Sequence, residues 1–415
     1  MYDPKPAWWF DPEERDVPAP ELGLTTRFMD PERLTEEQEQ HMLRLLELAF
    51  NGGPAWFELP VSRADHWRWK LHDYPGPTRA ELMLRTNGSD APPPPPGPEP
   101  SAIIGMAAER WRPWLMQGRP RPMRNSVDLA VDPSYQGRGI QGRRRDWHHQ
   151  HGEFDHNDVS ISTNTHPTAR HISMRQGYRP VSNGLSIFTM PLNPSALAAP
   201  PPPPTPGASR TMVAITAEAR TRPQAVRWLG WHARWLRSRA RYELGRSRTT
   251  NPWTIETRPN FDDRIDGLLH AFSADFDVIY LRDREYLNWR YADPRGGPFT
   301  IRTAEANGEL LGYAVTRAWS RRSELADVVA QPGRTDVATS LIDDAIQLAR
   351  AAGSRRLRAW LPERHPYAPA FRSHGFREDA TPGRLLYGGP SMDEYSFLKS
   401  PDLRLHYVLG DTDAI

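Results

Sequence analysis

Hydrophobic and polar positions follow the same order twice along the 415-residue chain. Each block opens on a pattern of helical period, TEEQEQHMLRLLELAF (35–50) in the first and PNFDDRIDGLLHAF (259–272) in the second. Apolar runs of strand length follow in both blocks, then a helix, a strand, a second helix and a closing strand. Thr35 and Gln38 predict a capping box at the start of the first helix.

Landmark residues recur in the same order in the two blocks. Asp128 matches Asp327, and each lies almost the same number of residues before a glycine–aromatic pair. The matched segments are HWRWKLHDYPGP (66–77) with NWRYADPRGGP (288–298), VDLAVDP with ADVVAQP, and Gly177-Tyr178 with Gly375-Phe376. Because the period is a whole domain, the sequence predicts a tandem duplication of an α/β (α+β) unit and not a solenoid.

Two proline-rich segments divide the chain. APPPPPGPEP (91–100) separates two strand patterns and predicts a stiff insertion in a hairpin connection. APPPPPTPGAS (199–209) predicts a domain boundary, and recognition by an aromatic-lined domain is the alternative for such segments. The predicted organisation is an N-terminal arm (1–29), a first domain (30–196), a linker with a basic helix (197–250) and a second domain (251–415).

The linker segment 219–248 carries nine arginines and one glutamate. A helical stripe is predicted for its apolar residues, and Pro223 suits the first turn. The stripe comprises Val226, Leu229, Trp235, Leu236 and Leu244. One interpretation is a linker helix packed on one or both domains. The other is a basic amphipathic helix that makes a peripheral contact with an anionic membrane surface.

Composition narrows the class of protein. Hydrophobic residues make up 38% and charged residues 25% of the chain, which is typical of a soluble globular protein. A net charge of +2 does not indicate a nucleic-acid partner. The chain has no cysteine, which excludes disulfides, thiolate metal sites and a cysteine nucleophile. Without a signal-peptide pattern or a membrane-spanning apolar run, we expect a cytoplasmic protein.

The segment SVDLAVDPSYQGRGIQG (126–142) carries the strongest chemical signal. A strand pattern leads into a turn built on Gln136, Gly137, Arg138 and Gly139, and a helix start follows. N–H groups of such a turn and of the first helical turn have no internal partners, and the helix dipole favours an anion there. The pattern predicts a phosphate or pyrophosphate site that is neither a Walker loop nor a Rossmann turn.

LAVDPSYQGRGI resembles the acetyl-CoA-binding motif of the GNAT N-acetyltransferase superfamily. The following strand pattern VSISTN (159–164) and the Gly177-Tyr178 pair resemble later GNAT segments, so the likeness covers about residues 30–195. One departure is Gln141 at the last Gly/Ala position of the motif, with Gly142 shifted by one. The second copy resembles a degenerate GNAT domain, since its turn AQPGRTD lacks the motif and places Asp336 where pyrophosphate would lie.

The resemblance implies two GNAT folds, each a central mixed, mostly antiparallel β-sheet flanked by helices. It also implies acetyl-CoA as acyl donor, with the pantetheine arm along the strand before the turn and the pyrophosphate on the turn. Carried over residue by residue, the cofactor-binding positions are Leu129, Ala130, Val131, Gln136, Gly137, Arg138, Gly139, Ile140, Gln141, Gly142 and Asn164.

Catalytic residues are harder to assign. The resemblance places Ser173 where many GNAT enzymes have a tyrosine general acid, and Phe371 stands there in the second copy. Tyr178 or water is the alternative acid. Asp128 is the candidate base, and a structural carboxylate is the alternative reading of this residue.

Four histidines invite a metal hypothesis, because His148 and His151 share a helix face and His149, His156, Glu153 and Asp155 lie near in sequence. GNAT chemistry needs no metal and the H-E-x-x-H spacing is absent, so we predict no metal site.

The resemblance thus implies an acyltransferase that moves an acyl group from acetyl-CoA to the amine of a small molecule or protein by direct attack. The alternative is a catalytically inactive GNAT scaffold that binds CoA or a partner. Since two domains share one chain, we expect a monomer or weak dimer.

Overall fold

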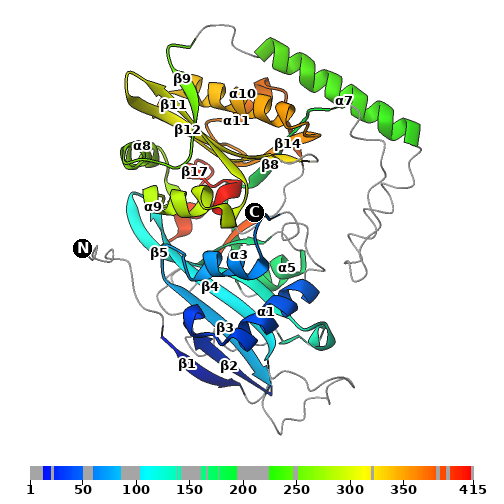
Figure 1. Cartoon of the computed structure of the whole chain (residues 1–415), viewed down its shortest axis with the longest axis vertical. Helices are drawn as coiled ribbons and strands as arrows, with labels where there is room; N and C mark the ends of the chain where they lie inside the picture. The colour runs from blue at the N-terminus through cyan, green and yellow to red at the C-terminus, as the bar shows by residue number, and fades with distance from the viewer. Residues whose placement is uncertain are drawn as a thin grey trace. The chain divides into compact units, whose positions relative to one another are not determined.

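The computed structural model divides into two compact units, each made of three chain segments. The first unit comprises Met1–Ser182, Val278–Leu281 and Gly383–Leu403, and the second comprises Asn183–Asp277, Arg282–Pro382 and Arg404–Ile415 (Figure 1). The structure describes residues 13–19, 23–49, 59–85, 103–137, 139–140, 142, 160–164, 167–175, 177–193, 224–245, 251–318, 322–379, 384–388 and 393–412. Both proline-rich segments and the histidines at 148–156 lie outside these residues.

The larger sheet of the first unit is antiparallel throughout. Its order is β1-β2-β3-β4-β10, and β5 also pairs with the long strand β4. Ala80 of β3 lies opposite Ala108 of β4, which confirms the hairpin predicted around the first proline segment. The strands are β1 (Arg15–Ala19), β2 (Leu24–Met29), β3 (Thr78–Arg85), β4 (Ile103–Met116), β5 (Arg119–Val131) and β10 (Val278–Tyr280).

Two helices cover this sheet (Figure 1) and bury their apolar faces against it. They are α1 (Glu36–Ala49) and α3 (Arg63–Leu71), and α5 (Pro167–Arg175) follows later in the chain. The predicted capping box of α1 is confirmed. Gln38 N donates to Thr35 Oγ1 at 3.2 Å and Thr35 N donates to Gln38 Oε1 at 2.9 Å. The core includes Met42, Leu45, Leu46, Trp67, Leu71, Leu82, Met106 and Val127.

A smaller sheet of the first unit contains a strand from near the C-terminus. β16 (Arg384–Gly388) lies between β6 (Ser160–Asn164) and β7 (Arg179–Pro180), antiparallel to both. Three short 3-10 turns complete the described part of this unit: η2 (Pro31–Arg33), η3 (Pro133–Tyr135) and η7 (Ser396–Lys399).

The second unit has one seven-stranded sheet of order β15-β8-β14-β13-β12-β11-β9. Here β8, from the N-terminal half of the chain, lies between β14 and β15. Only the β13–β14 pair is parallel, so the sheet is mixed and mostly antiparallel. The strands are β8 (Leu185–Pro191), β9 (Thr254–Arg258), β11 (Phe299–Ala306), β12 (Glu309–Ala318), β13 (Ser323–Ala330), β14 (Arg356–Pro362) and β15 (Arg377–Asp379).

Helices and short turns surround that sheet. They are α7 (Gln224–Gly245), α8 (Arg264–Ser273), α9 (Arg284–Leu287), η5 (Asn288–Ala292), η6 (Pro294–Gly296), α10 (Thr335–Ala351), α11 (Ala368–Ser373) and η8 (Leu409–Asp411), with the short strand β17 (Leu405–His406). The two units confirm the predicted fold class. Among the described residues no helix is both long and apolar enough to span a membrane.

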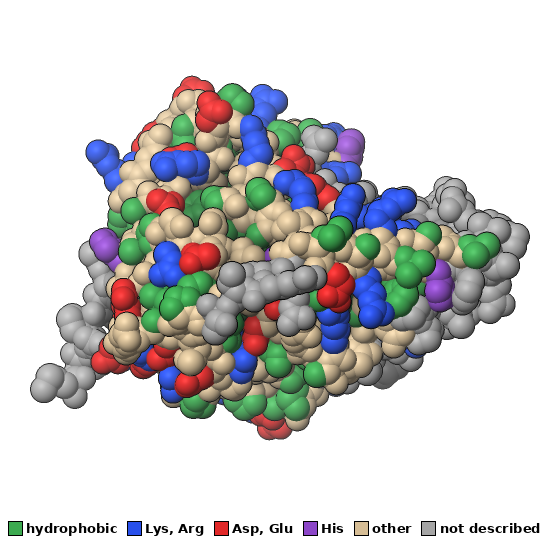
Figure 2. Space-filling view, turned by 90° about the horizontal axis from the view of Figure 1, so that it is seen from above, with side chains coloured by type: hydrophobic (Ala, Val, Ile, Leu, Met, Phe, Trp, Pro, Cys, Tyr) green, Lys and Arg blue, Asp and Glu red, His purple; other side chains and the backbone are tan. Residues whose placement is uncertain are grey.

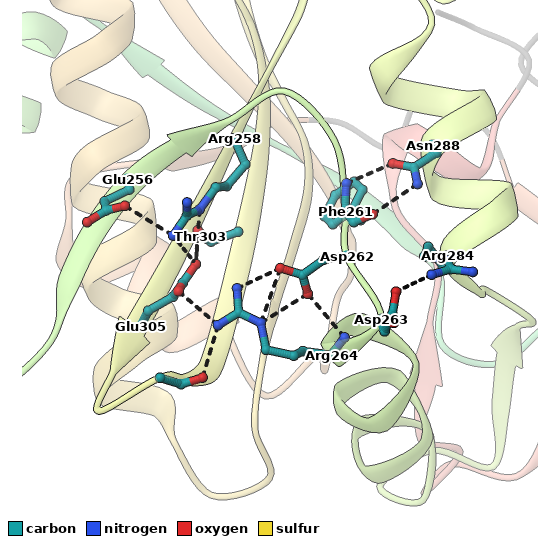
Figure 3. A network of polar contacts seen from close by, with 11 residues as sticks. Glu256, Arg258, Phe261, Asp262, Asp263, Arg264, Arg284, Asn288, Thr303 and Glu305 are labelled. Carbon is teal, nitrogen blue, oxygen red and sulfur yellow. Dashed lines mark hydrogen bonds and ion pairs between the residues drawn. The ribbon is translucent and has the colours of Figure 1, made fainter.

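Helix α8 begins five residues later than the hydrophobic pattern predicts. Asp262 is the reason: its carboxylate accepts a hydrogen bond from Arg264 N at 3.1 Å and pairs with the Arg264 side chain (Figure 3). Glu305 also binds Arg264, at 2.9 Å. A side chain that accepts from the backbone two residues on stabilises a turn and so delays the helix.

The apolar residues predicted as one stripe of the basic helix divide between two faces of α7. In α7 the side chains of Leu229, Leu236 and Leu244 are 60%, 57% and 87% exposed. The face that packs instead carries Ser238 and Tyr242, which are buried, together with two tryptophans. Tryptophan, serine and tyrosine can satisfy polar groups at a packed surface, and leucine cannot.

Candidate functional site

The strand before the glycine turn contains a β-bulge. Val127 lies opposite Ala108 and Ala130 lies opposite Met106, so β5 has one more residue than β4 at this point. Asp128 adopts the left-handed conformation there, with φ of 53°. A bulge bends its strand and leaves backbone groups out of the ladder, which is a common way to aim groups at a ligand.

The sheet of the first unit opens directly after this bulge. β5 and β6 are in contact, yet in the part of the chain that the structure describes β6 pairs with β16 and forms no ladder with β5. The second unit opens at the corresponding place. Its parallel pairing between β13 and β14 is limited to Ser323–Leu325 against Leu357–Ala359. Backbone groups at such an opening must pair with something other than the neighbouring strand.

The turn after β5 has the conformation that its glycines predict. Gly137 and Gly139 have φ values of 77° and 71°, and open space surrounds both, so their role is backbone conformation and not close packing. Gln136 donates its Nε2 to Val131 O at 2.9 Å and thereby closes the turn over the strand end. Arg138 and Gln141 lie outside the described residues, whereas Ile140 and Gly142 have helical backbone.

The predicted pantetheine positions divide into exposed and buried ones. Leu129 is 44% exposed, whereas Ala130 and Val131 are buried. Val131 packs with Ile140, Tyr135 and Met83 in a small apolar cluster that holds the turn against the sheet. Asn164 ends β6, where its backbone pairs with Arg384.

Asp128, the candidate base, is an ion-pair partner of Lys70. Lys70 Nζ lies 2.7 Å from Asp128 Oδ1, and the two side chains are only 8% and 7% exposed. Lys70 comes from α3, within the Trp-Arg-Trp segment that the sequence comparison aligned between the two copies. Sequence reasoning missed this lysine. The available signal was the position of Lys70 directly after Trp67 and Trp69, because tryptophans are usually largely buried. A lysine buried beside them needs a carboxylate partner.

The two candidate acids, Ser173 and Tyr178, are both buried. Tyr178 N donates to Ser173 O at 3.1 Å, after Gly177 at φ of 88°. The Tyr178 ring packs so closely on β16 that a Cβ at Gly388 would lie 2.6 Å from it. The equivalent Phe371 of the second copy is likewise buried, against Phe188 and Phe376. The described contacts of these residues are those of core side chains.

In the second unit, Asp327 belongs to a buried ionic cluster. Arg282 Nη1 lies 2.9 Å from both carboxylate oxygens of Asp327, and Arg282 Nη2 lies 2.5 Å from Asp411. Tyr313 donates to Asp327 at 2.9 Å. Burial, and then the charge of Asp327, raises the pKa of this tyrosine well above its usual value. Burial opposes the charge on Arg282, but the two carboxylates outweigh it and raise the arginine pKa.

Two histidines extend the cluster as a hydrogen-bonded chain. His365 Nδ1 accepts from Tyr367 N at 3.1 Å, so His365 Nε2 carries the proton that bonds His406 Nδ1 at 2.9 Å. Burial, with a further effect of Arg282, lowers the pKa of His365 to about 3 and that of His406 well below its usual value. Both rings are therefore neutral at pH 7. Among the described residues, no group of three or more His, Asp or Glu side chains has the geometry of a metal site.

The C-terminal segment fills the opening of the second sheet. η8 contacts both β13 and β14, beyond the last residues at which these strands pair. Gly410 fits so tightly that a Cβ would overlap Tyr291 Oη and lie 3.1 Å from Ala326 O. The opening in the second unit is thus occupied by the chain itself, with Asp411 and His406 carried on the segment that enters it.

The fold is that of known acyltransferases. A probable N-acyltransferase from Enterococcus faecalis V583 superposes with a TM-score of 0.52 at 12% identity, over 88% of this chain and 73% of that one. Saccharomyces cerevisiae N-myristoyltransferase with bound myristoyl-CoA also gives 0.52 at 12% identity, over 87% and 78%. No protein-family model and no curated protein matches the sequence. The likeness confirms a GNAT-like fold.

Proposed function

We propose that the first unit is an acyl-CoA-dependent N-acyltransferase whose donor is acetyl-CoA. One combination of features carries the proposal. A bulged strand ends at an open seam of the sheet and runs into a turn with Gly137 and Gly139 at positive φ. That arrangement supports one continuous path in which a pantetheine arm follows the strand and a pyrophosphate lies at the turn and helix start.

The proposed reaction is direct transfer. The nitrogen lone pair of a neutral amine attacks the thioester carbonyl, a C–N bond forms, and the C–S bond breaks. The ammonium proton of the tetrahedral adduct is lost to a base or to water, and the departing thiolate takes up a proton. Backbone N–H groups of β5 beside the bulge are the donors that we propose for the oxyanion.

We place a single donor site in the chain. The seam of the second unit is filled by η8, and its turn carries Asp336, whose carboxylate pairs with Arg334 at 3.0 Å. A carboxylate at that position repels a pyrophosphate. The acceptor is a primary amine of a small molecule or a protein, and use of acetyl-CoA implies a cytoplasmic enzyme.

Calorimetric titration with acetyl-CoA tests the proposal, and two glycines give a matched pair of variants. Gly139→Ala forces a side chain into φ of 71°, whereas Gly142 has no positive φ and equally open surroundings. We expect one site per chain that Gly139→Ala and Arg138→Glu weaken and Gly142→Ala leaves intact. Binding that survives Gly139→Ala and Arg138→Glu unchanged would place the donor elsewhere.

A second candidate function is a CoA-binding module without catalysis. The observation in its favour is that Lys70 already engages Asp128 and that Ser173 is buried. Turnover with any member of an amine panel excludes this candidate. Tight acetyl-CoA binding with no acetylated product across amino acids, polyamines, amino sugars and N-terminal peptides supports it. Comparison of acetyl-CoA with longer acyl-CoA donors belongs in the same assay.

A further inference from the structure

Helix α7 is fixed to the second unit by one face. Trp231 and Trp235 donate their indole N–H groups to Asn193 O and Leu192 O, each at 3.2 Å. Ser238 donates to Gly375 O at 2.7 Å, and Tyr242 donates to Asp343. The helix contacts β8 and α11 along this face. These contacts fix the rotation of α7 about its axis, and so determine which of its side chains face away from the second unit.

An arginine-lined groove runs beside the packed face. It encloses about 610 Å³ of empty space that is partly open to solvent. Arg234, Arg237 and Arg241 of α7, Arg356 of β14 and Arg377 of β15 all line it. Among the described residues that form its wall, none is acidic.

The positive charge of the arginines in this groove favours binding of an anion. In the part of the chain that the structure describes, no carboxylate pairs with Arg237 or Arg241, and Arg234 stacks over the Trp231 ring at 5.6 Å. Guanidinium groups that converge on one groove repel one another, and a bound phosphate relieves the repulsion by accepting bidentate hydrogen bonds. The groove thus has the chemistry of a phosphate site.

The outward face of α7 is apolar. Leu229, Leu236 and Leu244 are more than half exposed, and at 100° per residue they form one stripe with Ala233 and Ala240. That stripe adjoins the helix side that carries Arg237 and Arg241. Figure 2 shows Lys and Arg side chains beside hydrophobic ones on the surface that it presents. Exposed leucines in a continuous row indicate contact with an apolar phase.

We propose that α7 docks the second unit onto an anionic phospholipid surface. Lipid phosphates enter the arginine groove, and the leucine stripe lies at the boundary between head groups and acyl chains. A soluble phosphorylated ligand would use the arginines but would leave the leucines exposed. A lipid surface would contact both the arginine groove and the leucine stripe, so we favour a lipid phosphate over a soluble one. The proposal does not depend on acyl transfer.

Co-sedimentation of the full chain with vesicles tests this proposal. We expect binding to vesicles of phosphatidylcholine with phosphatidylglycerol at low salt, and little binding to phosphatidylcholine alone. Arg241→Glu replaces a positive charge at the groove by a negative one, a change of two units, so we expect affinity to fall about thirtyfold. Arg239→Glu makes the same charge change on the opposite flank of α7 and should cost less than about threefold. Equal losses in the two variants would overturn the role of the groove.

Leucine variants separate a lipid surface from a soluble ligand. Leu236→Ser and Leu244→Ser alter exposed side chains, so circular dichroism should stay unchanged while vesicle affinity falls about tenfold when both are combined. Calorimetry with glycerol phosphate and pyrophosphate supplies the second arm. Binding of these ions that Arg241→Glu abolishes, together with no sedimentation on anionic vesicles, would overturn the lipid proposal and assign the groove to a free phosphate.

Discussion

Lys70 Nζ and Asp128 Oδ1 are 2.7 Å apart in a nearly buried ion pair that joins α3 to the bulge of β5. The pair fixes the bulge from the helix side, just before the strand reaches the glycine turn. Asp128 therefore has a structural role whether or not it also accepts a proton. Its two roles can be separated by experiment.

Asp128→Asn should destabilise the first unit by about 3 kcal/mol, because the Lys70 ammonium then loses its buried counter-charge. Urea denaturation measures this loss. Lys70→Met combined with Asp128→Asn should recover much of the stability, since no buried charge remains.

The double variant then answers the catalytic question. If Asp128 is the base, the double variant folds, binds acetyl-CoA and has lost most of its kcat. Retention of wild-type kcat in that variant would leave Asp128 a structural carboxylate alone.

Arg282→Met should cost about 3–5 kcal/mol of unfolding free energy, because Asp327 and Asp411 would be left as unpaired buried carboxylates. Arg334→Met is the matched control. Arg334 also pairs with one aspartate, Asp336, but on the surface, where such a pair contributes about 0–1 kcal/mol. Similar losses for the two variants in denaturant titrations would contradict the buried cluster as a centre of stability.

Stability should fall on acidification below pH 6.5. His365 has a folded-state pKa of about 3, against about 6.5 in the unfolded chain, so between these values the unfolded state binds more protons. The unfolding free energy then decreases by about 1.4 kcal/mol per pH unit for this histidine as the pH falls. His406, whose pKa is also lowered by burial, acts in the same direction.

Melting temperatures of wild type and His365→Gln between pH 7 and pH 5 measure the effect. The glutamine amide keeps a polar group near the position of the ring Nε2 and does not titrate. We expect a flatter profile for the variant, and parallel profiles would show that His365 does not carry the pH dependence.

Gly375→Ala should detach α7 from the second unit. Gly375 has φ of 87°, and a Cβ there would overlap Ser238 O on the helix. Gly353→Ala is the control, because Gly353 also has positive φ, at 68°, but open surroundings. The backbone strain alone costs about 1 kcal/mol, so any additional loss for Gly375→Ala measures the helix contact. Tryptophan fluorescence of Trp231 and Trp235 should change in that variant only.

Much of this architecture was predictable from local patterns. The strand–turn–helix order, Gly137 and Gly139 at positive φ, and the equivalence of Gly177 with Gly375 all follow from residue types whose conformational preference is strong. The Thr35–Gln38 capping box is equally local. Such features depend on a few neighbouring residues. Their order predicted a duplicated α/β unit, and the resemblance to the GNAT superfamily implied the mixed, mostly antiparallel sheets.

Other features depend on partners that a single pattern does not name. The alternation of apolar residues predicts that β8 is a strand, but it does not predict that β8 pairs with β14. The same holds for β16, which pairs with β6. The residues predicted as one stripe in α7 divide between two faces for a related reason. Leucines indicate the buried face of a helix only when no other face packs better. Here the face with Trp231 and Trp235 packs, because their indole N–H groups donate hydrogen bonds to the second unit.

The exchange of β8 and β16 has a consequence for biosynthesis. The small sheet of the first unit is complete only after Arg384–Gly388 has left the ribosome, although β6 and β7 emerge much earlier. Until then both strands present unpaired edges, which attract other chains. Closure of so long a loop is also slow. These strand edges therefore stay unpaired for most of the synthesis, and the N-terminal half of the chain alone would lack β16.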